Sequence, residues 1–263
     1  MKYVLVTGAY GGMGKACVAE LQKSGYCVIA LDKATAPPTK NVIPINVDLT
    51  DEKTVKNAYE KVASITDELF AIIHLAGVYM LDSLVEMETE KYKKIFDINV
   101  HGAFLVNKIF RPLLKKGSRI VIITSELAPL DPLPFTGIYA ITKSALDKYA
   151  YSLRMELQLL DIAVSVLRAG AVTTPMLGAS TSALDQFCEN TKIYSYNSKR
   201  FKKIVDSVEA RSVPPEKVAR KIHKILSAKK THFAYKLNRN PLLLLLNVLP
   251  KPVQLSVIKA ILK

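Results

Sequence analysis

Residues 7–16 read TGAYGGMGKA and place four glycines and a lysine within ten positions. A glycine-rich turn before a helix binds phosphate groups through its backbone N–H groups, either of a nucleoside triphosphate or of a dinucleotide. A triphosphate loop has four residues between its first glycine and the Gly-Lys pair, followed by Ser or Thr. Here five residues separate Gly8 from Gly14, and Ala16 follows the lysine. The sequence therefore excludes the triphosphate loop.

The surroundings of the glycines fit a dinucleotide site. The apolar run KYVLVT precedes them, a helical pattern follows from Lys15, and Asp32 ends the next apolar run, YCVIAL. An acidic residue about 20 positions after the glycines accepts hydrogen bonds from the ribose hydroxyls of the cofactor. Because its charge repels a 2′-phosphate, we expect NAD in preference to NADP. The neighbouring Lys33 is the residue that would tolerate that phosphate.

Apolar runs with strand character alternate with helical stretches along the chain. This alternation predicts an α/β fold of the Rossmann type, a doubly wound parallel sheet with helices on both faces. We expect one catalytic, dinucleotide-binding domain over residues 1–235 and a short apolar and basic helical extension over 236–263. The polar segment 176–211 is predicted to be mobile or to form a lid. The predicted strands lie at residues 2–7, 26–31, 41–46, 69–76, 118–124, 162–169 and 231–237, and the predicted helices at 15–24, 51–64, 88–114, 139–160 and 215–228.

Composition narrows the function classes. The three cysteines form no CxxC pair and are odd in number, which is typical of a reduced intracellular protein, so we expect a cytoplasmic location. No histidine or cysteine lies at metal-ligand spacing, so no metal site is predicted. Residues 192–263 contain 17 Lys and Arg and three Asp and Glu, which accounts for the whole net charge of +14. The basic region matches no nucleic-acid-binding module, and no nucleic-acid partner is expected.

The segment GIYAITK predicts the reaction chemistry. Tyr139 and Lys143 are four positions apart at the start of a predicted helix and therefore share one face. An ammonium group beside a phenol favours phenolate, so we expect Lys143 to lower the pKa of Tyr139 and make it an acid or base near neutral pH. Ser125 ends a predicted strand, where parallel sheets bind ligands, and its hydroxyl is predicted to hold a substrate oxygen.

Together these motifs resemble the short-chain dehydrogenase/reductase family. The resemblance covers roughly residues 1–235 and implies hydride transfer between a nicotinamide cofactor and an alcohol or carbonyl compound. It also implies a role for Asn99, which would anchor a water molecule in a proton relay. The implied catalytic residues are Asn99, Ser125, Tyr139 and Lys143, and the implied cofactor-binding residues are Gly8, Tyr10, Gly11, Gly12, Met13, Gly14, Asp32, Asp48, Leu49, Ala76, Gly77, Tyr139, Lys143, Val172 and Thr174.

The chain departs from the family pattern at several positions. His74 and Leu75 precede Ala-Gly where the family usually has two asparagines, and Ala169 replaces the usual proline before Gly170. HLAG and the glycine spacing also resemble the longer, sugar-nucleotide-modifying branch, which stays open as an alternative. A second alternative is a non-catalytic dinucleotide sensor or scaffold.

The C-terminal region resembles the hydroxysteroid and retinol dehydrogenase-like subgroup, whose substrates are apolar. Apolar side chains in the loop 126–136 and the segment 177–206 are predicted to line a pocket for a bulky, steroid-like or lipid alcohol or ketone. The tail around Leu242–Leu246 is too short to span a bilayer. It is predicted to pack on the substrate cleft or a partner subunit, or to touch a membrane peripherally. The resemblance also implies a homodimer or homotetramer.

Overall fold

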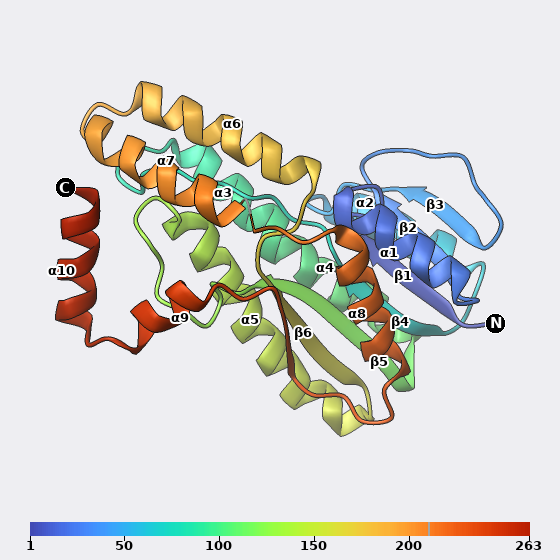
Figure 1. Ribbon diagram of the computed structural model, residues 1–263. Helices are drawn as coiled ribbons and strands as arrows, with labels where there is room; N and C mark the ends of the chain where they lie inside the picture. The colour runs from blue at the N-terminus through green and yellow to red at the C-terminus, as the bar shows by residue number, and fades with distance from the viewer. Residues whose placement is uncertain (210) are drawn as a thin grey trace.

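The computed structural model describes residues 1–209 and 211–263, which form a parallel sheet between two layers of helices (Figure 1). The strand order is β3-β2-β1-β4-β5-β6-β7, and every pairing between neighbours is parallel. The strands β2 and β3 are added on one side of β1, and the strands from β4 onward are added on its other side. The topological switch point therefore lies between β1 and β4, and such sheets bind ligands at this point. The predicted doubly wound sheet is therefore confirmed. Its strands are β1 (Tyr3–Thr7), β2 (Cys27–Asp32), β3 (Val42–Asn46), β4 (Leu69–His74), β5 (Leu114–Ser125), β6 (Ala163–Ala169) and β7 (Ala234–Leu237).

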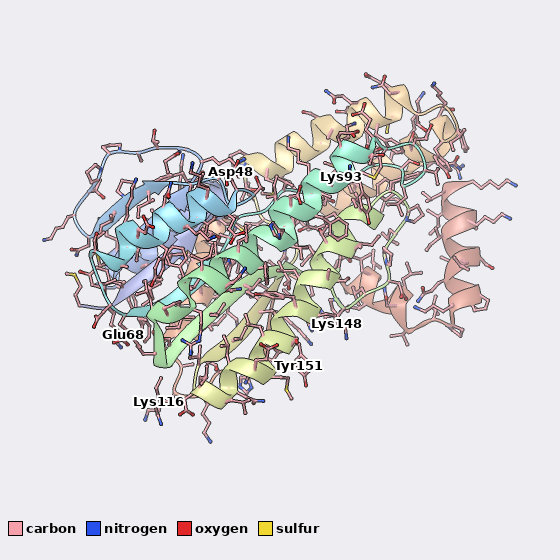
Figure 2. All side chains as sticks on the ribbon, turned by 180° about the vertical axis from the view of Figure 1, so that it is seen from behind. Asp48, Glu68, Lys93, Lys116, Lys148 and Tyr151 are labelled. Carbon is pink, nitrogen blue, oxygen red and sulfur yellow. The ribbon has the colours of Figure 1, made fainter. Side chains whose placement is uncertain are left out.

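Helices cover both faces of the sheet because the strands are apolar on both sides. One core cluster joins the sheet to α2, α4 and α5, and a second joins it to α1 and α8. Figure 1 shows α1 and α8 in front of the sheet, and Figure 2 shows the opposite layer from behind. The helices that cover the sheet are α1 (Gly12–Lys23), α2 (Glu52–Ala63), α4 (Gly102–Phe110), α5 (Gly137–Leu157) and α8 (Pro215–Ser227).

The predicted helix over 88–114 is interrupted. It consists of α3 (Thr89–Phe96), a π-helical turn η1 (Asp97–His101), and α4, which continues into a short 3₁₀ turn η2 (Arg111–Leu113). A π-helical turn adds a residue to the helix and changes the direction of its side chains, and such turns are frequent at functional sites. Here the turn contains the buried Asn99. A second 3₁₀ turn, η3 (Gln158–Leu160), follows α5.

The segment 176–211, which the sequence predicts to be mobile or to form a lid, is largely helical over its described residues. Its described residues form two helices, α6 (Pro175–Asn190) and α7 (Ser195–Glu209), which lie side by side in Figure 1. Apolar side chains at helical spacing explain the difference, because Leu184 and Phe187 of α6 pack with Phe201 and Val205 of α7 in a third core cluster.

The C-terminal residues form two further helices, α9 (Pro241–Val248) and α10 (Lys251–Leu262), at the end of the molecule far from β3 (Figure 1). The side chain of Asn197 on α7 donates a hydrogen bond to the carbonyl of Leu262, which fixes the end of α10 against α7. Among the described residues, no helix combines the length and apolar character needed to cross a bilayer. The three cysteines are free and buried.

Candidate active site

The glycine-rich turn forms a cradle at the switch point of the sheet. Gly8 has a φ of 66°, and a Cβ atom there would lie 2.7 Å from the backbone of Ala76. A Cβ on Gly14 would lie 2.0 Å from the carbonyl oxygen of Gly8, so both positions require glycine. Helix α1 begins immediately after Gly11, and no described side chain caps its first N–H groups. These N–H groups and the helix dipole suit a pyrophosphate, so the residues fit a dinucleotide.

A cavity of about 380 Å³ extends from this cradle along the ends of β1 and β2. It contains most of the predicted cofactor-binding residues, from Gly8 to Gly14 and on to Asp32, Asp48, Leu49, Ala76, Gly77 and Thr174. Val172, Tyr139 and Lys143 line the adjoining larger cavity, and Met13, Gly77 and Thr174 line both. Lys33, which the sequence marked as able to tolerate a 2′-phosphate, also lines this cavity. The prediction missed Val47, Thr50, Leu75, Val78, Ile98 and Met176, which all lie within two positions of a predicted site residue.

Asp32 and Lys33 have separate partners. The carboxylate of Asp32 accepts hydrogen bonds from the backbone N–H groups of Tyr10, at 2.8 Å, and Ala34, at 3.0 Å. Lys33 forms an ion pair with Asp48, 2.7 Å from Nζ to Oδ2. A carboxylate has about four acceptor positions, so Asp32 retains capacity for ribose hydroxyls. The charge of Lys33 is directed to Asp48 across the same cavity.

Ser125, Tyr139 and Lys143 lie together at the carboxyl end of the sheet. Ser125 is the last residue of β5, and α5 carries Tyr139 and Lys143 on successive turns of one face. Ser125 and Tyr139 line the same cavity, and the Ser125 side chain is close enough to act on the pKa of Tyr139. Nζ of Lys143 donates to the carbonyl oxygen of Ile123 at 3.3 Å.

Burial, not the neighbouring lysine, dominates the acidity of this group. It raises the pKa of Tyr139 to about 12, against the opposing effect of the Ser125 side chain. Burial also lowers the pKa of Lys143 to about 8. Nζ of Lys143 is 5.8 Å from the centroid of the Tyr139 ring. We expected Lys143 to lower the pKa of Tyr139, and this prediction is wrong. Both side chains are buried, and the loss of water disfavours the charged form of each.

The π-helical turn brings Asn99 to the same place. Its Oδ1 accepts a hydrogen bond from the N–H of Val78 at 2.8 Å, and its Nδ2 donates to the carbonyl of Val78 and the hydroxyl of Thr142. A Cβ on Gly77 would lie 3.2 Å from Oδ1 of Asn99 and 3.3 Å from Nζ of Lys143. Gly77 therefore allows these two side chains to approach the same stretch of backbone.

The larger cavity, about 650 Å³, opens from Ser125 and Tyr139 and is lined mainly by apolar side chains. Part of this lining was predicted, since Leu127, Leu133 and Pro134 come from the loop 126–136 and Phe201 from α7. Of the other aromatic residues predicted there, Phe187 and Tyr194 pack against Phe135 instead. The prediction left open where the C-terminal residues lie, and both α9 and α10 line this cavity.

Two charged side chains line the larger cavity in the described chain, Lys143 and Glu126. Glu126 follows Ser125 directly and is almost fully buried. Its Oε2 accepts a hydrogen bond from the backbone N–H of Asn240 at 2.6 Å, immediately before α9. Burial raises the pKa of Glu126, against the effects of this hydrogen bond and of Arg239. Glu126 was predicted only as part of the loop 126–136, and no local pattern in the sequence indicates this contact.

The chain is similar to a known family of proteins. The family model for short chain dehydrogenases matches residues 2–185. The chain is 27% identical over 205 residues to an NADPH-dependent 1-acyldihydroxyacetone phosphate reductase of Schizosaccharomyces pombe, covering 74% of this chain and 69% of that protein. It is 32% identical over 192 residues to estradiol 17-beta-dehydrogenase 2 of Mus musculus, covering 68% of this chain and 50% of the mouse protein.

A solved structure shares the fold. The short chain dehydrogenase family protein from Francisella tularensis superposes with a TM-score of 0.74 at 24% identity, covering 90% of this chain and 96% of that chain. The family model matches well over half of the chain and includes the glycine cradle, Asn99, Ser125, Tyr139 and Lys143. The chain belongs to the short chain dehydrogenase family of NAD(P)-dependent oxidoreductases.

Proposed function

We propose that the protein interconverts a bulky, mostly apolar secondary or primary alcohol and the corresponding ketone or aldehyde. One observation carries this proposal: Ser125 and Tyr139 line the same, mainly apolar cavity of about 650 Å³. A cavity of this size and lining suits a steroid-like or lipid compound. The names of the S. pombe reductase and the mouse estradiol dehydrogenase are consistent with substrates of this kind.

Asn99, Ser125, Tyr139 and Lys143 are the proposed catalytic residues. The bound nicotinamide cofactor supplies or accepts the hydride. In the reduction direction, the Tyr139 hydroxyl donates its proton to the carbonyl oxygen, and Ser125 orients that oxygen by a hydrogen bond. With a pKa of about 12, Tyr139 is protonated at neutral pH, which suits it as the proton donor. A charged Lys143 close by stabilises the phenolate that remains, and Asn99 anchors the water that returns the proton.

NAD is the proposed cofactor, held by the predicted residues from the glycine cradle to Thr174. The argument rests on Asp32, whose negative charge lies in the cavity where a 2′-phosphate of NADP would enter. The S. pombe relative is named NADPH-dependent. The proposal of NAD for the present chain therefore rests on Asp32 and not on the relative.

Partners and location follow from the same proposal. We expect a cytoplasmic homodimer or homotetramer with residues 1–235 as the catalytic domain and residues 236–263 as its extension, in peripheral contact with a membrane through the basic C-terminal region. A gel-filtration measurement with light scattering tests the oligomeric state.

The test of the reaction is a screen of lipophilic alcohols and ketones with NAD(H) and NADP(H), using the wild type and Tyr139→Phe. The wild type is expected to turn over at least one compound. Tyr139→Phe is expected to lose turnover with little change in cofactor affinity, because the phenyl ring keeps the packing and lacks the proton. Normal turnover by a folded Tyr139→Phe protein would contradict the mechanism.

A further inference from the structure

Helix α9 has an apolar surface that the rest of the chain does not cover. Its sequence, PLLLLLNV, is apolar except for Asn247, yet none of its residues is buried. Leu242 and Leu245 are each 64% exposed, and Val248 is 81% exposed. A helix that is hydrophobic all round is normally enclosed by protein or lipid. The outer face of α9 therefore lacks an apolar partner within the described chain.

This exposed surface is also the rim of the larger cavity. Leu242 and Leu245 of α9 and Ile261 of α10 line that cavity, and all three are more than half exposed. The apolar surface therefore continues from the outside of the molecule toward Ser125 and Tyr139. Next to this rim, Leu255 of α10 is 68% exposed. A substrate that enters past these side chains meets a mainly apolar lining on its way to Ser125 and Tyr139.

The charge around the rim is positive. Lys259 of α10 and Lys263, which follows the last residue of α10, are exposed, whereas Lys251 at the start of α10 forms an ion pair with Asp131. Residues 217–263 contain no Asp or Glu. Arg200 near the start of α7 donates a hydrogen bond to the carbonyl of Ile261 and so joins α7 to the end of α10. The same part of α7 carries the exposed Lys199 and Lys203. Clustered lysines around a short apolar surface are attracted to anionic lipid headgroups.

The same charge argues against the second occupant that would fit an apolar face, another copy of this chain. A two-fold contact through α9 and α10 would place two basic regions against each other with no acidic residue of 217–263 to compensate. An anionic bilayer provides both the hydrocarbon for the leucines and the opposite charge for the lysines.

We infer that α9 and α10 form a docking face for an anionic lipid bilayer, and that the substrate passes from the bilayer directly into the cavity. The second half of this inference rests on the proposed apolar substrate. The first half stands on the exposed side chains alone, so vesicle binding and turnover are measured separately.

The experiment is flotation of the full-length protein with phosphatidylcholine vesicles and with vesicles that also contain phosphatidylserine, at low and high salt. Binding is expected to the anionic vesicles at low salt and to weaken at high salt. Val248→Ser combined with Leu255→Ser is expected to weaken binding about tenfold, because both side chains are exposed and neither lines the cavity. Lys259→Gln and Lys263→Gln are each expected to weaken it about fivefold, the factor equivalent to about 1 kcal/mol.

Matched controls remove the same kinds of group elsewhere. Leu159→Ser removes a side chain that is 82% exposed beyond the end of α5, and Lys148→Gln removes an exposed lysine on α5, labelled in Figure 2. Both are expected to bind vesicles like the wild type. The inference is overturned if the protein does not bind anionic vesicles, or if the control variants weaken binding as much as the α9–α10 variants do. It is also overturned if the protein binds no vesicles and forms a dimer that Val248→Ser dissociates. Lack of turnover with intact vesicle binding would instead refute the proposed substrate class.

Discussion

The carboxylate of Glu126 accepts a hydrogen bond from the backbone N–H of Asn240 at 2.6 Å, and 114 positions of sequence separate the two residues. The contact joins the residue after Ser125 to the N-cap of α9. At the other end of α9, the side chain of Asn247 accepts a hydrogen bond from the N–H of Asp131. The loop that follows the catalytic strand therefore holds α9 over the cavity at both ends.

The Glu126 contact predicts how firmly α9 is held. Glu126→Leu is expected to increase hydrogen exchange of residues 240–249, because it leaves the N–H of Asn240 unpaired and removes a bond to a charged group, worth about 1.5–3 kcal/mol. Glu126→Gln keeps an oxygen acceptor and is expected to exchange at a rate between wild type and Glu126→Leu. Unchanged exchange of α9 in Glu126→Leu would show that apolar packing alone holds the helix.

Cofactor choice is predicted to depend on Asp32. The wild type is expected to bind NAD more tightly than NADP, and Asp32→Ala to lose about tenfold or more of its NAD affinity, as expected for lost hydrogen bonds to a charged group. Calorimetric titration of both proteins with both cofactors measures this. Lys33→Ala serves as the companion variant, because a wild-type preference for NADP that disappears in Lys33→Ala would assign the phosphate to that lysine.

Lys143 is predicted to lower stability while it supports turnover. Its folded pKa of about 8 lies below the ordinary 10.5, so the unfolded chain binds this proton more tightly. Below pH 8 the protein is destabilised by about 3 kcal/mol, and the penalty decreases as pH rises from 8 to 10.5. Lys143→Met is therefore expected to raise the free energy of unfolding in urea at pH 7 and to abolish turnover. A Lys143→Met protein that is less stable at pH 7 would show that the ammonium group has stabilising contacts.

His74 predicts the acid limit of the fold. Its side chain is buried and its Nε2 lies 2.9 Å from Oδ1 of Asn107. Burial lowers the pKa of His74 to about 4, against the effect of that hydrogen bond. The folded state thus resists protonation, and about 3 kcal/mol of stability present above pH 6.5 is lost as the pH falls through 4.

His74→Asn tests this dependence, because asparagine is polar and does not titrate. Its free energy of unfolding is expected to fall less than that of the wild type between pH 6.5 and 4. Parallel pH profiles for the two proteins would rule out His74 as the group responsible.

The sequence alone was sufficient for the sheet, the glycine cradle and the group of Ser125, Tyr139 and Lys143. These features depend on local patterns: a strand's apolar run, glycines between a strand and a helix, and two side chains one helical turn apart. Because parallel strands all end at one edge of the sheet, motifs at strand ends predict a common site.

Tertiary structure decided the rest. The cover over the cavity depends on contacts between Glu126 and Asn240 and between Asp131 and Asn247, which no local pattern encodes. The π-helical turn at Asn99 and the pairing of α6 with α7 likewise depend on packing against other segments. The acidity of Tyr139 was predicted in the wrong direction because spacing shows which charge is near, whereas desolvation depends on everything that surrounds the side chain.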